Sequence, residues 1–509
     1  MKKLLLFLLA SIITTAVFAA TYYIDPTCTF NGNGATTSCA ASAGAAGASN
    51  AWYTAGDLSD GTIYAQKVGT TYTINSGNVA MGSNTTITSY GTGAMPIIVR
   101  SAAAASGSSA INTNNNGTVI DGIQVNHTNA IGVYIGGDWQ DLSSVTVKNS
   151  KFVGAGDQPS VYIYTTPFNV RGITIQSNEF TGTQPQGIQS YPHTRYTEGW
   201  NILSNNFHDM TGQGIQTVAS TPNLDKALYG FDISWNTFTN LTQAAIDTES
   251  GTQLKTGLSR ISHNTAINIG TDTEPSINAF QLSYNYGTTI EYNYIENVKA
   301  SVGFRDADCI ILDQDSSLSK YSSGNIVRYN VCKTAQGHGI NMFKASSNQI
   351  YGNIVTGTDT GIAVMTILSA DNSIYNNVAY NNLTGGLVDV AASSSYWYNN
   401  IFWGNSDYDM AFNQGTTVPV DGNNCWQVAS SYPASWTPSA TNVVTTDPKF
   451  LSVGSLNFHL NYGSPCINIG KTSIMTTDAA GYTMGFDAGI YQTYGLGLNG
   501  MNLNGVRSK

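Results

Sequence analysis

The chain has 509 residues, only 10% of them are Asp, Glu, Lys or Arg, and its formal net charge is −10 at pH 7. Globular proteins usually contain about 25% of these residues. A nucleic-acid partner is not expected, because neutralising phosphates requires a basic surface. The acidic balance also disfavours a polyanionic sugar chain, unless a cation or a local basic strip intervenes.

The N-terminal residues have the pattern of a secretory signal peptide. Two lysines follow Met1, and then come the apolar run LLLFLLASIITTAVFAA and a small-residue exit of the Val17-x-Ala19 type. No later apolar run approaches the roughly 20 residues needed to span a bilayer. We therefore expect residues 1–19 to be a signal peptide. The mature chain is expected to be secreted, extracellular or periplasmic, and to be a monomer without a membrane span.

Six cysteines in an exported chain favour disulfides over free thiols. Metal binding through cysteine is not expected, because no Cys-x-x-Cys spacing occurs. The pairs that we expect are Cys28 with Cys39, Cys425 with Cys466, and Cys309 with Cys332. Sequence alone leaves other connectivities open.

A six-residue phrase, apolar-x-x-Asn-x-apolar, recurs between about residues 120 and 400. Neighbouring slots are mostly 23 to 31 residues apart, and one pair is 37 apart. The strand formers are Ile, Val, Phe and Tyr, and the leucine ladder of leucine-rich repeats is missing, so the period predicts a parallel β-helix. The Asn slots, preceded by Ser150 in a matching phrase, are positions 178, 205, 236, 264, 293, 330, 353, 377 and 400.

Each rung of such a solenoid pairs with the next at about 4.8 Å and sends one column of side chains inward. The Asn slots should form a structural ladder at a turn, because Asn tolerates the left-handed conformation and bonds to neighbouring backbone. We assign residues 20–405 to the helix and residues 406–509 to a β-rich cap or a continuation of the solenoid. The predicted core column, two residues after each slot, is Phe152, Phe180, Phe207, Phe238, Ala266, Ile295, Cys332, Val355, Ala379 and Phe402.

Phrases at both ends of the chain carry a family resemblance. YYIDPTC near the N-terminus and DPKF, NFHLNYGSPCINIG and DAGIYQ near the C-terminus resemble the opening and closing phrases of secreted bacterial right-handed parallel β-helix proteins of the pectin-lyase-like superfamily. Together with the repeat, the resemblance covers nearly the whole mature chain and implies an all-β fold with a single right-handed parallel β-helix. Members of the superfamily include lyases, hydrolases, epimerases and non-catalytic adhesins, so the fold alone does not decide the activity.

Charged residues concentrate in one stretch, since five of the eleven residues from Arg305 to Asp315 are charged. The rungs of Asn264 and Asn293 also carry extra residues before their second strand. Long loops on neighbouring rungs are a common way for a solenoid to build a cleft wall. We therefore expect a site near these rungs.

The spacing between each Asn slot and the second strand of its rung aligns the outward side chains of successive rungs. It places Asp247, Glu249 and Asp313 on one face, with Glu249 and Asp313 two rungs, or about 10 Å, apart. Asp313 and Asp315 should lie about 7 Å apart on one strand. Either pair could divide the acid and base roles of glycoside cleavage, or hold Ca²⁺ through oxygen ligands. The alternative is a solvated acidic strip.

The same alignment places His338 one rung above Asp308, which is an acid–base arrangement. DADCII, Cys332 and Gly337-His338-Gly339 resemble the Asp-Asp-Cys…Cys…Gly-His-Gly segment of polygalacturonase-type glycoside hydrolases, with Ala307 in place of the first Asp. The resemblance implies that Asp308 matches their second carboxylate, that His338 matches their histidine, and that Cys309 and Cys332 form their local disulfide.

An elimination mechanism would need a base and a cation that neutralises a uronate carboxylate. Arg305 and Lys344 are candidates for this contact with substrate. Aromatic side chains could stack on sugar rings or on one another for stability. The aromatic candidates for this flank are Tyr162, Tyr164, Tyr191, Trp200, Tyr284 and Tyr286.

Two hypotheses follow. The first is a secreted polysaccharide-degrading β-helix protein that uses carboxylate and His acid–base chemistry or β-elimination, with no cofactor expected except Ca²⁺ as an option. The second is a non-catalytic carbohydrate-binding or adhesin-type β-helix. The catalytic candidates are Asp247, Glu249, Asp308, Asp313, Asp315 and His338, and the candidates for substrate binding are Arg305, Lys344 and Tyr191.

Overall fold

The computed structural model describes residues 19–100, 108–136, 140–165, 168–192, 197–218, 228–249, 259–273, 275, 277–301, 306–313, 322–366, 369–389, 394–412, 420–427, 439–445, 447–470 and 488–489. Within these residues the chain is built from strands, with one 3-10 helix at Val453–Ser455. None of the described helical structure is long and apolar enough to cross a membrane.

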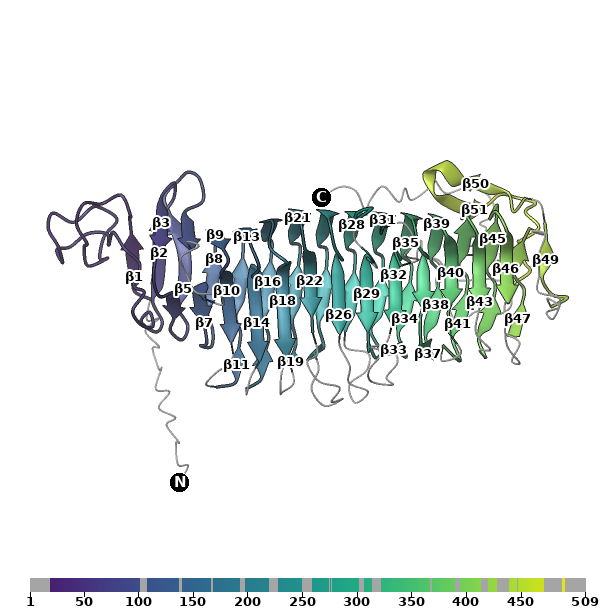
Figure 1. The fold of residues 1–509 in the computed structure, drawn as a ribbon, viewed down its shortest axis with the longest axis horizontal. Coiled ribbons are helices and arrows are strands. Elements are labelled where there is room, and N and C mark those ends of the chain that lie inside the picture. Colours follow the sequence, from purple (N-terminus) through teal and green to yellow (C-terminus); the bar gives the residue numbers. More distant parts are fainter. Residues whose placement is uncertain are drawn as a thin grey trace, which may run out of the picture.

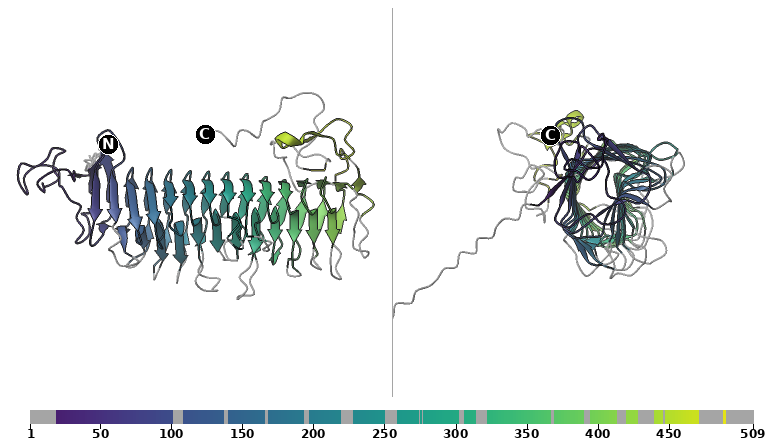
Figure 2. Two further views of the ribbon diagram at one scale, coloured as in Figure 1. Left: turned by 45° about the horizontal axis from the view of Figure 1, so that its top comes forward. Right: turned by 90° about the vertical axis from the view of Figure 1, so that its left-hand side faces the viewer.

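Three long sheets of parallel strands run the length of the molecule (Figure 1). The chain visits them in a fixed order, which we number sheet 1, sheet 2 and sheet 3, and successive coils superimpose when viewed end-on (Figure 2). The predicted parallel β-helix is therefore confirmed. Sheet 3 has 13 strands: β4 (Val79–Met81), β7 (Ser109–Thr113), β10 (Ile131–Gly136), β14 (Val161–Thr165), β18 (Gln186–Pro192), β22 (Gln213–Thr217), β26 (Ile246–Glu249), β29 (Phe280–Ser283), β32 (Ile310–Asp313), β36 (Ile340–Met342), β40 (Thr360–Val364), β43 (Gly385–Asp389) and β46 (Tyr408–Phe412).

Sheets 1 and 2 have 15 strands each within the described residues. Sheet 1 consists of β1 (Thr21–Ile24), β2 (Ile63–Lys67), β5 (Thr86–Tyr90), β8 (Val119–Asp121), β12 (Thr146–Lys148), β16 (Thr174–Gln176), β20 (Asn201–Leu203), β24 (Asp232–Ser234), β27 (Arg260–Ser262), β30 (Thr289–Glu291), β34 (Ile326–Arg328), β38 (Gln349–Tyr351), β41 (Ser373–Tyr375), β44 (Tyr396–Tyr398) and β47 (Val420–Gly422). Sheet 2 consists of β3 (Thr71–Ile74), β6 (Ile97–Arg100), β9 (Gln124–Thr128), β13 (Lys151–Ala155), β17 (Glu179–Gly182), β21 (Asn206–Met210), β25 (Thr237–Leu241), β28 (Thr265–Ile269), β31 (Tyr294–Val298), β35 (Val331–Ala335), β39 (Ile354–Thr358), β42 (Val378–Tyr380), β45 (Ile401–Trp403), β48 (Cys425–Trp426) and β49 (Val443–Val444).

Short strands complete the described structure. Four short strands lie beside the loops that return to sheet 1 and pair with one another in a small sheet. They are β11 (Leu142–Ser143), β15 (Val170–Arg171), β19 (Thr197–Glu198) and β23 (Leu228–Tyr229). Two others pair with each other, β33 (Ser322–Ser323) and β37 (Ala345–Ser346). The last two form an antiparallel pair, β50 (Phe450–Ser452) and β51 (Asn457–Leu460).

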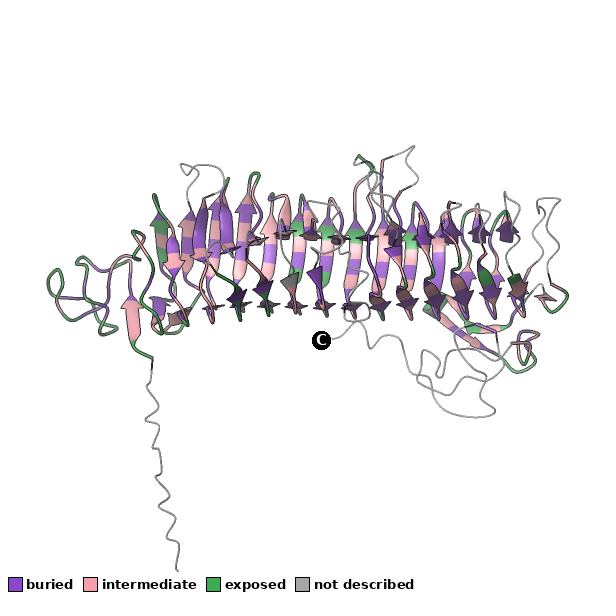
Figure 3. Ribbon diagram, turned by 90° about the horizontal axis from the view of Figure 1, so that it is seen from below, coloured by how far each residue is buried: buried purple, intermediate pink, exposed green. Residues whose placement is uncertain are grey.

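The predicted inward column is the core of the helix, and its ten side chains are at most 1% exposed. Phe152, Phe180, Phe207 and Phe238 stack there, with ring centroids 4.6 to 5.0 Å apart. Along the strands, buried residues alternate with partly exposed ones (Figure 3). This alternation is what turns one face of each strand inward and leaves the other face available for function.

The predicted asparagine ladder is present at the turn from sheet 1 to sheet 2. The Nδ2 group of Asn178 donates to Oδ1 of Asn205, and that of Asn205 to Oδ1 of Asn236, each at 3.0 Å. A second hydrogen bond from Asn205 Nδ2 reaches the Ile175 carbonyl at 2.8 Å. Because the buried amides saturate one another and the backbone, they serve the fold rather than chemistry.

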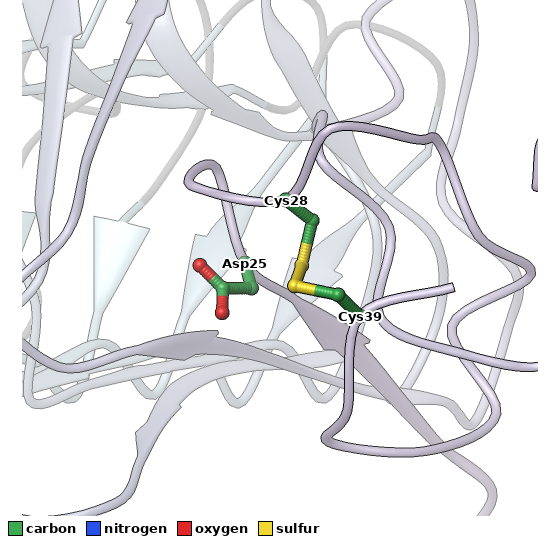
Figure 4. Close-up of side chains that lie close together, drawn as sticks. All are labelled: Asp25, Cys28 and Cys39. Atoms are coloured by element: carbon green, nitrogen blue, oxygen red, sulfur yellow. A yellow bond between two sulfur atoms is a disulfide. The ribbon is translucent and has the colours of Figure 1, made fainter. Parts of the chain in front are cut away.

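All three expected disulfides are present, with Cα–Cα distances of 5.4, 6.0 and 5.6 Å for Cys28–Cys39, Cys309–Cys332 and Cys425–Cys466. Near the first, Asp25 accepts a hydrogen bond from Lys67 at 2.8 Å and lies beside the two sulfur atoms (Figure 4). Both sulfurs are already bonded to each other, so this cluster staples the N-terminal loop instead of holding a metal.

The C-terminal part lies against the outside of sheet 2. Phe458 and Leu460 of β51 join a buried apolar cluster with Ile354, Val378 and Ile401, which are outward residues of β39, β42 and β45. Sheet 2 itself continues through β48 and β49. The later rungs of sheet 2 are therefore covered, while the outer face of sheet 3 is a different side of the helix.

Candidate functional site

The outer face of sheet 3 has the alignment that the repeat predicts. Glu249 of β26 pairs with Ser283 of β29, and Ser283 pairs with Asp313 of β32. Glu249 and Asp313 are thus two rungs apart, about 10 Å between backbones. Asp247 lies two residues before Glu249 on the same strand, and all three residues are partly exposed. The structure therefore brings three of the predicted catalytic residues onto one face.

Two glutamines hold the carboxylate of Asp247. The amide Nε2 of Gln213 donates to its Oδ2 at 3.0 Å, and the Nε2 of Gln216 donates to the same oxygen at 3.5 Å. Burial raises the pKa of Asp247 to about 6, and the two amide hydrogen bonds oppose this rise. A carboxyl group with a pKa near the working pH is suited to donate a proton and then take one back.

A groove of about 520 Å³ lies on the same face, over β10, β14 and β18. Three of its tyrosines form a loose cluster, with ring centroids 6.0 Å apart for Tyr134 and Tyr162 and for Tyr162 and Tyr164. Burial raises the pKa of Tyr162 to about 12, so its hydroxyl keeps its proton. The lining residues are Ile131, Tyr134, Asp157, Gln158, Pro159, Tyr162, Tyr164, Pro185, Gln186 and Gln189.

A chain of amides connects this groove to Asp247. Gln186 and Gln189, which line the groove, donate from Nε2 to Oε1 of Gln216 at 3.1 and 2.9 Å. Because Gln216 accepts both bonds on its oxygen, its amide nitrogen is directed at Asp247. Groove, amides and carboxylate therefore form one continuous polar strip across β18, β22 and β26.

Asp308 lies immediately before β32 and is fully buried. Its Oδ1 accepts the backbone N–H of His338 at 2.5 Å, and its Oδ2 accepts Nδ2 of Asn341 at 2.8 Å. Its own N–H donates to Oδ1 of Asn278 at 3.0 Å. Burial raises the pKa of Asp308 to about 6, and the charge of His338 lowers it in part. In this arrangement Asp308 joins three successive rungs, and its carboxylate is covered.

His338 lies one rung above Asp308, as the repeat predicts, since the Cys309 N–H donates to the His338 carbonyl. The hydrogen bond to the carboxylate, however, comes from the backbone of His338 and not from its imidazole. The buried Nδ1 of His338 and the buried Oδ1 of Asn341 have no hydrogen-bond partner in the described part of the chain. The pair is adjacent, but the imidazole and the carboxylate do not form a hydrogen-bonded couple.

The other predicted site residues are Asp315, Arg305, Lys344 and Tyr191. Asp315 and Arg305 lie outside the described residues. The Nζ of Lys344 lies 5.2 Å from the centroid of the Phe343 ring. Tyr191 pairs with Tyr164 of the groove and is partly exposed, so it extends the tyrosine cluster by one rung.

Three of the six aromatic candidates are buried and cannot stack on a sugar, which leaves the structural alternative for them. Trp200 is fully buried, and Tyr284 and Tyr286 are 5% and 9% exposed. These rings point into the protein because they lie in turns or at strand ends, where the inward–outward alternation of a strand no longer holds.

The site residues that sequence reasoning missed are Tyr134 and the glutamines. Gln189 and Gln216 do appear in the aligned outward column, directly before Asp247. Amides do not titrate, so nothing in their spacing marks them as chemical groups. The signal that was present is their shared column with a carboxylate.

A metal site on this face is not formed by the described residues. Among them, the one group of three His, Cys, Asp or Glu side chains with converging ligand atoms is the Asp25 and disulfide cluster. Ca²⁺ takes six to eight oxygen ligands at about 2.3–2.6 Å. Glu249 and Asp313, with backbones about 10 Å apart, would need help from other groups to share an ion.

No protein-family model matches the chain, and no curated protein sequence matches it. Among solved structures, it is similar to XylC in complex with xylose, with a TM-score of 0.43 and 14% identity over 65% of this chain and 66% of that chain. It is also similar to the catalytic domain of GH87 α-1,3-glucanase in complex with nigerose (TM-score 0.38, 11% identity, 70% and 64% covered). A third is the periplasmic alginate epimerase AlgG (TM-score 0.35, 13% identity, 75% and 77% covered). The chain spans just under two thirds of the first two. By its three parallel sheets and stacked coils, the chain is a parallel β-helix protein.

Proposed function

We propose that the chain is a carbohydrate-active enzyme that binds a polysaccharide along the outer face of sheet 3 and hydrolyses it at Asp247. One observation carries the proposal. A carboxyl group whose pKa is raised to about 6 stands two residues from a second carboxylate, on a strip that runs into a tyrosine-lined groove. Tyrosine rings stack on the apolar faces of sugars, while amides and hydroxyls bond to their edges.

The two carboxylates have separate roles in the proposal. Asp247 donates a proton to the glycosidic oxygen, and Glu249 activates the attacking water. Two residues along one strand correspond to about 7 Å, near the lower end of the roughly 6.5–9.5 Å separation of inverting glycosidases. Asp313, two rungs from Glu249, is a second candidate for the base. In this proposal Asp308 and His338 have a structural role, because the Asp308 carboxylate is covered.

The lining of the groove favours hydrolysis over elimination. None of its described lining residues is Lys or Arg. Elimination requires that the carboxylate of a uronate be neutralised before the adjacent carbon loses its proton. The proposed substrate is therefore a neutral or weakly charged polysaccharide.

The test is product analysis on a panel of neutral and acidic polysaccharides. We expect new reducing ends without the ultraviolet absorbance of an unsaturated product, and a loss of about 10²–10⁴-fold in Asp247→Asn, which removes the proton donor. Asp371→Asn is the matched control, because Asp371 is exposed and its φ of 58° suits Asn. Unsaturated products would show that the reaction is an elimination and not a hydrolysis. Full activity in Asp247→Asn would refute the assigned site.

A binding role without catalysis is the alternative, and the groove itself favours it, since stacking and amide bonds suffice to hold a sugar chain. In that case no substrate of the panel yields products, and the wild type and Asp247→Asn retain the same polysaccharides with equal affinity. A panel that yields no products but shows this retention would favour the alternative.

A further inference from the structure

One column of residues follows the turn from sheet 1 to sheet 2, directly before the asparagine ladder. Every member has a φ between 50° and 64°, the left-handed region that Gly and Asn tolerate best. Four consecutive members are aromatic, while their neighbours on both sides are small or polar. In rung order the column reads Asn149, Ser177, Ser204, Trp235, His263, Tyr292, Tyr329, Gly352, Asn376, Asn399 and Asn423.

The four aromatic rings form a stack that follows the rungs. Trp235 and His263 have centroids 4.1 Å apart at an interplanar angle of 17°, and His263 and Tyr292 are 5.1 Å apart at 22°. Tyr292 and Tyr329 are 5.0 Å apart at 24°. Bulky side chains are disfavoured in the left-handed region, so contact between the rings must offset this cost for the members that have a ring on both sides.

The two ends of the stack differ. At one end, Tyr329 meets the edge of Tyr351 at 5.9 Å, and the guanidinium of Arg328 lies 5.6 Å from the Tyr329 centroid. At the other end, Trp235 is 61% exposed, and the next position in the column is the exposed Ser204. Among the described residues, the indole therefore has a ring on one face only, although it bears the same backbone cost as the others.

We propose that the free face of Trp235 binds a sugar ring of a polysaccharide. Rungs repeat at about 4.8 Å, which matches the ring spacings within the stack, so a ring placed over Ser204 would continue it. The exposed Asn206, at the start of β21, lies on the same rung as Ser204 and offers an amide to sugar hydroxyls. Burial lowers the pKa of His263, which favours the neutral form of the ring behind the indole.

A sugar fits this position better than other flat ligands. A nucleotide or a nucleic acid brings phosphates along with its flat base, and a chain with a net charge of −10 would repel them. A pyranose instead presents an apolar face to the indole and hydroxyls to Ser204 and Asn206. The class of ligand rests on the proposed function, but the position does not.

This surface is separate from the groove. Trp235 lies between β24 of sheet 1 and β25 of sheet 2, and β25 lies between β21 and β28 in the sheet. That corner is the one that does not border sheet 3. The surface would therefore hold a long or insoluble chain outside the cleavage site, and its loss should spare the turnover of short substrates.

The test is affinity electrophoresis in gels that contain single polysaccharides, together with depletion by insoluble polysaccharides. Trp235→Asn removes the ring and keeps a residue that tolerates the left-handed conformation, as Asn149 does in the same column. We expect at least tenfold weaker retention, with hydrolysis of a short soluble oligosaccharide unchanged. Tyr462→Asn removes an aromatic ring that is 98% exposed elsewhere and should retain normally. Trp235→Phe should restore part of the retention and guards against a folding defect.

The outcomes separate this proposal from the proposed function. Retention that is equal in wild type and Trp235→Asn, or no retention of the wild type on any polysaccharide, overturns it. Asp247→Asn should lose hydrolysis and keep retention. Retention that depends on Trp235, without hydrolysis in any assay, supports this surface and refutes only the enzyme.

Discussion

Asp247 and Asp308 are two carboxylates with the same raised pKa, about 6 in each case, and the same main cause, which is burial. They differ in what holds them. Side-chain amides hold Asp247, on an outward column that leaves it partly exposed, whereas a backbone N–H and Asn341 hold Asp308, which is fully buried. A perturbed pKa therefore marks both a candidate acid and a structural clamp, and only access to substrate separates the two.

The largest expected effect is on turnover, at the partly exposed acidic residues of β26. Glu249→Gln removes the proposed base and keeps the shape of the side chain, so we expect kcat to fall about 10²-fold or more. The free energy of unfolding should change by less than about 1 kcal/mol, as is usual for a partly exposed position. The measurement is release of reducing ends beside a denaturant titration. Wild-type turnover in this variant would exclude Glu249 as the base, and Asp313→Asn would then be the variant to measure.

Loss of the buried Asp308 carboxylate should lower the stability of the protein. Asp308→Ala leaves the N–H of His338 and the amide of Asn341 without their acceptor, and unmet buried polar groups cost about 1–3 kcal/mol each. We expect the free energy of unfolding to fall by about 2–4 kcal/mol, measured by urea titration. Turnover per folded molecule at low temperature should fall less than tenfold. Unchanged stability with a 100-fold loss of turnover would reverse the roles given to the two carboxylates.

Stability should also depend on pH through Asp308. Its folded pKa is raised from 3.8 to about 6, so its stabilising contribution is complete below about pH 4 and is lost as the pH rises to about 6. Two pKa units correspond to about 3 kcal/mol. Unfolding free energies between pH 4 and 7.5 should therefore fall more steeply in the wild type than in Asp308→Asn. Asp409, whose pKa burial raises to about 7, titrates in both proteins and cancels in the difference. Parallel curves would contradict the assignment.

The smallest expected effect concerns the amide chain. Gln216→Leu removes a hydrogen bond that lowers the pKa of Asp247. Because Asp247 is the proposed proton donor, kcat/KM should decline above about pH 6 in the wild type, and this limb should move upward by less than one pH unit in the variant. The pH profile is the measurement. A downward shift would show that Gln216 does not act on the proton donor.

Much of the fold could be predicted because its signal is local and repeated. The asparagine slots fix one turn in each rung, and the residue two positions later is inward in every rung. Counting from those slots also predicted that Glu249 and Asp313 share a column and that His338 lies above Asp308. A constant period converts sequence distance into spatial neighbours.

The rest of the site could not be predicted, because it depends on what covers each residue. The alignment of the rungs predicts that Asp308 lies beside His338. It does not predict that the backbone N–H of His338, and not its imidazole, donates to the carboxylate. Trp200 lies in a turn and is fully buried, and the strand repeat carries no information on burial there. Tyr134 and Gln216 carry no titrating group, so their place in the strip appears only when the rungs are stacked.

The most direct test of the proposed site is a crystal structure of Asp247→Asn soaked with an oligosaccharide from a polysaccharide that the wild type cleaves. We expect a sugar chain that runs from the groove over β10, β14 and β18 across β22 to β26, with sugar rings against the tyrosines of the groove and a glycosidic oxygen within hydrogen-bond distance of residue 247. A chain bound on another face, with the groove and residue 247 untouched, would contradict it.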